Sequence, residues 1–129
     1  MKHLRISLAA ILLLAAGVVA LAQNDRVPPN IAGKWTIYVE GDDTTKDPTK
    51  TVEFVQDGNQ LTGKFKGPNQ SGNIQGHVSP RGEIGFHTKT RTVLVFRGNV
   101  EGNTMRGQFE VHEHNGSVRT ATWTAVRSN

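Results

Sequence analysis

Glutamate and histidine alternate near the C-terminal end of the chain with a spacing that suits a metal ion. Glu110, His112 and His114 occupy every second position, so on a β-strand all three side chains would point the same way and could face one ion. Their neighbours argue against that use. Phe109 and Val111 are apolar and take the buried face of the same strand, which leaves the glutamate and the histidines in water near a turn. We therefore predict no dedicated metal site.

An oxygen-rich loop over residues 41–49 is the second candidate. Its carboxylates and hydroxyls belong to Asp42, Asp43, Thr44, Thr45, Asp47 and Thr49. Calcium binds such oxygens, but a calcium loop spaces its carboxylates regularly and ends in a bidentate glutamate. Because this loop has neither feature, we expect a solvated loop over one end of the fold, with no metal and no cofactor.

The residue types give little support for catalysis. The chain has no cysteine, no Gly-x-Ser-x-Gly and no glycine-rich phosphate loop. His77 and His87 fall on the outer face of neighbouring predicted strands. General acid–base catalysis needs a titratable group in a sheltered pocket, and our assignment of faces places no carboxylate on the inward side. The sequence therefore predicts that the protein is not an enzyme.

Short β-strands carry all of these residues. From Ile31 onward, apolar and polar residues alternate, and no stretch has the 3.6-residue period of an amphipathic helix. Glycine, asparagine and proline mark short links that are typical of hairpins. The pattern predicts eight strands, over residues 33–40, 50–56, 60–67, 72–78, 82–88, 91–99, 103–112 and 117–127.

Two of these strands are near copies of each other. Residues 58–65 read Gly-Asn-Gln-Leu-Thr-Gly-Lys-Phe, and residues 102–109 read Gly-Asn-Thr-Met-Arg-Gly-Gln-Phe. In both, an apolar residue, a glycine and a phenylalanine lie on one face of the strand. We interpret the repeat as a structural feature of two equivalent strands and not as a functional motif. The inward glycines, Gly63, Gly76 and Gly107, would let the sheet coil and would leave space inside it.

The assignment of faces predicts a closed fold. The inward side is apolar and comprises Trp35, Ile37, Val39, Val52, Phe54, Leu61, Phe65, Ile74, Val78, Ile84, Phe86, Leu94, Phe96, Met105, Phe109, Val111, Ala121, Trp123 and Ala125. Eight hairpin-linked strands leave two unpaired edges unless the sheet closes. The sequence thus predicts an all-β, eight-stranded antiparallel up-and-down barrel, with an open β-sandwich as the alternative.

One predicted strand, over residues 91–99, is apolar on both faces. Leu94 and Phe96 belong inside, which leaves Val93 and Val95 exposed on the outer wall. A pair of surface valines is common in strands. It could also form half of a contact between two copies, so a homo-oligomer through the Val93/Val95 face is an expectation.

The first 22 residues have the form of a secretory signal peptide. A basic start (Lys2, Arg5) precedes an almost wholly apolar run, and Ala20-Leu21-Ala22 resembles a cleavage site. The apolar run is shorter than the roughly 20 residues of a spanning helix. We expect export to the periplasm or the medium, with no membrane anchor in the mature chain. A polar lead-in over residues 23–31 would precede a barrel domain over residues 32–129.

The charge pattern argues against nucleic acid as a partner. The chain carries 15 lysines and arginines against 11 acidic residues, and two of the basic residues lie in the leader. The remaining basic residues are scattered among acids and form no stripe. They are typical of a solvated surface.

The ends of the predicted barrel resemble the calycin superfamily, which includes lipocalins, fatty-acid-binding proteins and avidins. Gly33-Lys34-Trp35 opens the first strand, and Trp123-Thr124-Ala125-Val126-Arg127 closes the last. The resemblance implies that Gly33, Trp35, Trp123 and Arg127 form a structural signature, with Trp35 packed beneath the barrel floor against a cation, Arg127 or Arg119. The chain is also similar, over nearly all of its mature length, to small exported bacterial domains of uncharacterised function.

The same resemblance suggests a ligand entrance. In calycins the first long loop flanks the mouth, so Asp42, Asp43, Thr44 and Thr45 become candidate ligand-binding residues. We expect a non-catalytic barrel that binds a small apolar or amphipathic molecule there. The alternative is a filled barrel that acts as a protein-interaction or envelope accessory module. Five phenylalanines and two tryptophans favour filling, and the inward glycines favour space.

Overall fold

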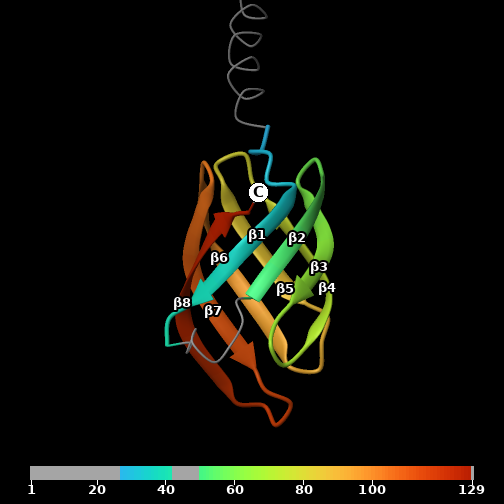
Figure 1. Cartoon of the computed structure of the whole chain (residues 1–129), viewed down its shortest axis with the longest axis vertical. Coiled ribbons are helices and arrows are strands. Elements are labelled where there is room, and N and C mark those ends of the chain that lie inside the picture. Colours follow the sequence, from blue (N-terminus) through green and yellow to red (C-terminus); the bar gives the residue numbers. More distant parts are fainter. Residues whose placement is uncertain (1–26, 42–49, 129) are drawn as a thin grey trace, which may run out of the picture.

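The protein is an antiparallel β-barrel of eight strands (Figure 1). A computed structural model describes residues 27–41 and 50–128. The strands are β1 (Gly33–Val39), β2 (Lys50–Asp57), β3 (Gln60–Lys66), β4 (Ser71–Val78), β5 (Glu83–Thr88), β6 (Val93–Glu101), β7 (Thr104–His112) and β8 (Val118–Arg127). These bounds confirm the eight strands that the alternating pattern predicts. The predicted leader, residues 1–22, lies outside the described residues.

The sheet closes on itself through its first and last strands. Each strand pairs with its sequence neighbour, and β1 also pairs with β8, from Trp35↔Arg127 to Val39↔Trp123. Among the described strands, closure leaves no unpaired edge. An open sheet of hairpins would expose two such edges to pairing with other chains. The barrel prediction is therefore confirmed, and the open sandwich is wrong.

Aromatic side chains fill the middle of the barrel. The rings of Phe86 and Phe96 stack with centroids 4.6 Å apart, and Phe109 lies 4.7 Å from Phe96 on its other side. Trp123 meets Phe96 edge to face at 5.3 Å, an arrangement that aromatic quadrupoles favour. The indole N–H of Trp123 donates to the carbonyl oxygens of Arg97 and Gln108, so its one polar atom is satisfied.

The inward glycines mark places where neighbouring strands come close together. A Cβ at Gly63, Gly76 or Gly107 would lie 1.8–2.1 Å from a carbonyl oxygen of the adjoining strand, well inside van der Waals contact. The expectation that they leave interior space is wrong, because the neighbouring backbone occupies the position that a side chain would take. They let the sheet coil tightly enough to close.

A strap of lead-in residues closes the barrel at the end where β1 begins and β8 finishes (Figure 1). Ile31 is fully buried there, and its carbonyl oxygen accepts a 2.9 Å hydrogen bond from Nε1 of Trp35. Gln56 holds the strap from β2: its Oε1 accepts from the Ile31 amide, and its Nε2 donates to the Pro29 carbonyl. The last residue of the predicted lead-in is thus a core residue.

Candidate ligand-binding site

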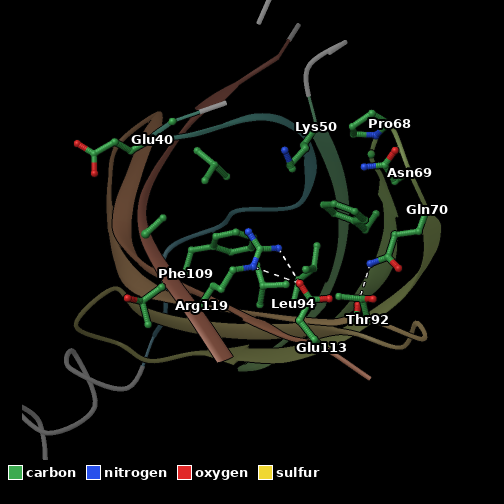
Figure 2. A pocket seen from close by; sticks show the side chains of 17 residues that line it. Glu40, Lys50, Pro68, Asn69, Gln70, Thr92, Leu94, Phe109, Glu113 and Arg119 are labelled. Carbon is green, nitrogen blue, oxygen red and sulfur yellow. Dashed lines mark hydrogen bonds and ion pairs between the residues drawn. The ribbon is translucent and has the colours of Figure 1, made fainter. Parts of the chain in front are cut away.

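The opposite end of the barrel is hollow. A cavity of about 820 Å³ opens there between the ends of the strands (Figure 2). Its lining includes the buried apolar residues Phe65, Leu94 and Phe109 towards the aromatic middle of the barrel, and the buried Val39. Its other described lining residues are Glu40, Gly41, Lys50, Gly67, Pro68, Asn69, Gln70, Thr92, Val111, Glu113, Arg119, Thr120 and Ala121. As far as residues 27–41 and 50–128 show, the barrel is therefore filled at its middle and closed end, and open at its mouth.

Three charged side chains at the mouth share the inward strand parity. Lys50 continues the Val52–Phe54 face of β2, Glu113 follows Val111 beyond β7, and Arg119 precedes Ala121 on β8. Alternation along a strand aims such residues into the barrel. Our prediction that no carboxylate lies on the inward side is wrong, because the inward face continues past the last apolar residue to Glu113.

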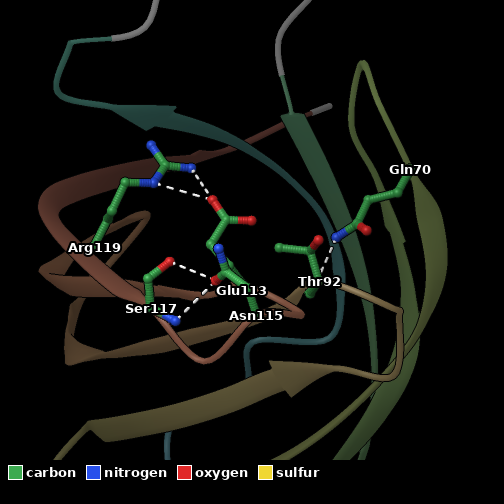
Figure 3. A network of polar contacts seen from close by, with 6 residues as sticks. All are labelled: Gln70, Thr92, Glu113, Asn115, Ser117 and Arg119. Carbon is green, nitrogen blue, oxygen red and sulfur yellow. Dashed lines mark hydrogen bonds and ion pairs between the residues drawn. The ribbon is translucent and has the colours of Figure 1, made fainter.

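Glu113 and Arg119 form an ion pair at the rim (Figure 3). Nη2 and Nε of Arg119 donate to the same oxygen, Oε2 of Glu113, at 2.8 and 3.2 Å. The hairpin that carries both residues extends beyond the barrel at this end (Figure 1). Its turn is held by Asn115, whose Oδ1 accepts from the amide and the hydroxyl of Ser117. The pair thus sits on a braced turn at one side of the cavity.

Gln70 braces another side of the mouth. Its Nε2 donates to the Thr92 carbonyl at 2.8 Å (Figures 2 and 3). The same Nε2 donates to Oγ1 of Thr90 at 3.1 Å. Thr90 in turn shares a 2.7 Å hydrogen bond with Thr88, which is fully buried and accepts from the Leu94 amide. The β3–β4 and β5–β6 links are therefore tied together, so that wall of the cavity is preformed.

The described lining combines apolar surface with a few charged groups. Among the described lining residues, the titratable groups are Glu40, Glu113, Lys50 and Arg119, and none is a histidine, serine or tyrosine. Apolar surface at the bottom and charge at the rim match a molecule with an apolar body and a polar end. The four loop residues proposed from the sequence, Asp42, Asp43, Thr44 and Thr45, lie outside the described residues.

Glu110 and His112 contact each other on the outer wall. Nε2 of His112 is 2.8 Å from Oε1 of Glu110, and Nη1 of Arg97 is 3.2 Å from Oε2. The hydrogen bond from His112 lowers the pKa of Glu110 below its ordinary value, with the positive charge of Arg97 adding to the effect. His114 is exposed. No group of three or more histidine, cysteine or acidic residues in the described ranges could hold a metal ion.

The remaining residues singled out from the sequence lie on the outer wall of the barrel. His77 and His87 are exposed on β4 and β5, whereas Val93 and Val95 are half-buried and not exposed as expected. Val95 pairs across the sheet with His87 on one side and Glu110 on the other. No helix in the described parts of the chain is long and apolar enough to cross a membrane.

Comparison with known proteins adds no assignment. No protein-family model matches the chain, and a search of the curated proteins finds no match. The site is therefore defined by its geometry.

Proposed function

We propose that the protein is an exported, non-catalytic barrel that binds a small amphipathic molecule in the cavity at its open end. The observation that carries the proposal is the cavity of about 820 Å³, apolar at its base and charged at its rim. A volume of this size is typical of small-molecule pockets. Export rests on the signal-peptide form of residues 1–22.

The alternative function, a filled barrel that acts as an interaction module, agrees with the middle of the barrel but not with its mouth. The aromatic packing of Phe86, Phe96 and Trp123 leaves the middle with no room for a ligand, as that alternative expects. The mouth is different, because small residues line part of it and its polar side chains are braced at the rim. We favour a shallow cup above a filled core, a calycin-like arrangement that the stack of Arg127 on Trp35 also supports.

Native mass spectrometry of the protein purified from its own host tests this function. We expect a retained small-molecule mass that is lost in Ala121→Trp, because an indole at this half-buried, inward position would fill the cup. The matched control is Thr124→Trp on the exposed outer face of the same strand, which should retain the mass. A bare mass for the unsubstituted protein, or equal retention in both variants, would argue against a cup.

A further inference from the structure

We propose that the ligand carries a carboxylate, that Arg119 binds it, and that Glu113 is a built-in competitor for the same guanidinium. This inference rests on the proposed function and adds the chemical class of the ligand. The structure already holds a carboxylate against Arg119, that of Glu113. The pair therefore shows that the guanidinium binds a carboxylate at this position.

Two arginines lie on the inward face of β8 and differ in how fully they are bound. Arg127, at the closed end, donates to Asn103 Oδ1 and to the carbonyl oxygens of Ala32 and Asn30. Arg119, at the mouth, has only Glu113 as a partner among the described residues, and through a single oxygen. A guanidinium has five N–H donors, so Arg119 keeps its Nη1 edge for another acceptor.

Arg119 is also placed where a ligand can reach it. Its side chain is 69% exposed, against 32% for Glu113, and Figure 2 shows the guanidinium extending over the opening. The apolar residues Phe65, Leu94 and Phe109 line the same cavity. A ligand with its apolar body on those residues would bring its polar end to the rim that carries Arg119.

The charge around the mouth favours an anion. Described residues at this end include the bases Lys50, Lys66, Lys89, Arg91 and Arg119, whereas the acids are Glu40 and Glu113. At the closed end, the acids Asp57, Glu83 and Glu101 are matched by the bases Lys34, Arg81 and Arg127. The excess of bases among the described residues of the mouth raises the local concentration of anions near the cavity.

The internal ion pair is weak enough to be displaced or shared. Exposed ion pairs contribute about 0–1 kcal/mol because water screens them. A ligand carboxylate can bind an arginine through two parallel hydrogen bonds, whereas Glu113 uses one oxygen. Removing the charge of Glu113 should therefore strengthen ligand binding, and removing that of Arg119 should weaken it.

Calorimetric titration with decanoate and 1-decanol, below their aggregation concentrations and near neutral pH, separates the head group from the chain. We expect the unsubstituted protein to bind decanoate about three- to tenfold more tightly than decanol. Glu113→Gln should tighten decanoate binding by a similar factor, and Arg119→Gln should remove the preference for decanoate. Decanol affinity should be the same in all three proteins, which also shows that the cup is intact.

The outcomes distinguish the two proposals. Equal binding of decanoate and decanol, or decanoate affinity unchanged in both variants, would overturn the carboxylate inference and leave the cup standing. Failure of both probes to bind the unsubstituted protein would overturn the proposed function and this inference with it. A tightening in Glu113→Gln together with a loss in Arg119→Gln would support both.

Discussion

The guanidinium carbon of Arg127 lies 4.6 Å from the centre of the Trp35 ring, and the two residues are directly paired across the seam between β1 and β8. The contact joins the strand that opens the barrel to the strand that closes it. Arg127 also holds the lead-in strap through the carbonyl oxygens of Asn30 and Ala32. One side chain thus fastens the seam and the closed end together.

Arg127→Ala should lower the free energy of unfolding by about 1–3 kcal/mol, because it removes a cation–π contact and several charge-assisted hydrogen bonds. The free energy of unfolding of Arg127→Lys should lie between those of the unsubstituted protein and Arg127→Ala, since an ammonium keeps the charge but cannot reproduce the planar fork of the guanidinium. Urea denaturation measures the effect. Arg106→Ala, on the exposed face of β7, is the control and should stay within about 0.5 kcal/mol. Equal effects at the two sites would contradict the role of Arg127.

Trp35→Ala should cost about 3–5 kcal/mol, as expected for loss of a large, fully buried aromatic side chain. Trp35→Phe should cost less, because most of the volume stays, but it leaves the buried Ile31 carbonyl without its indole donor. Thermal and urea unfolding would check this order. A near-neutral Trp35→Ala would show that the residue is not part of the core.

Gly107→Ala should be much more destabilising than Gly102→Ala. A Cβ at Gly107 would lie 1.8 Å from the Arg97 carbonyl oxygen, so β6 and β7 would have to separate. At Gly102 a Cβ meets nothing within 4 Å, and the cost comes only from its φ of 59°, about 1–2 kcal/mol for a residue with a side chain. Comparable losses of stability at the two positions would refute the close approach at Gly107.

Stability should depend on pH through Glu110. Its pKa is lowered in the folded protein by the hydrogen bond from His112 and by the charge of Arg97, so the folded state favours the carboxylate more than the unfolded state does. The resulting stabilisation is present above the pKa of the unfolded chain and is lost as the pH falls through the lower pKa of the folded protein.

Side-chain NMR titration of Glu110 gives that pKa directly. His112→Ala should raise it towards the ordinary value, because the largest cause is removed. When the pH is lowered from neutral to acidic, the free energy of unfolding should fall less in Glu110→Gln than in the unsubstituted protein. An unchanged pKa in His112→Ala would show that the histidine does not hold the carboxylate.

Sequence reasoning gives the architecture because alternation and turn residues are local signals. The strand phase places Trp35, Phe65 and Phe109 inside, and hairpin closure follows from the lack of any other partner for β1 and β8. The prediction that the inward glycines leave space is wrong for a physical reason. Whether an inward glycine borders empty space or a neighbouring backbone depends on sheet coiling, which the sequence pattern does not measure.

The mouth was only partly predictable. Its location follows from the long first loop, but the sequence analysis does not identify Glu113, because it ends the inward face at the last apolar residue. It considers Arg119 only as a partner of Trp35, which is wrong, because Arg127 occupies that position and Arg119 lies at the mouth. Extending the strand parity by one step on each side of the β7–β8 turn would have found both. Their pairing, and the brace of Gln70 on Thr92, depend on three-dimensional positions that no local pattern encodes.

Amide NMR mapping of 1-decanol binding tests the central claim, that the open end is a ligand site, most directly. We expect saturable shifts centred on Leu94, Phe109 and Ala121, which line the cavity, with Ile31 and Met105 near the closed end unchanged. Shifts that centre on the outer wall, or no shifts at concentrations that saturate the cup in calorimetry, would contradict it.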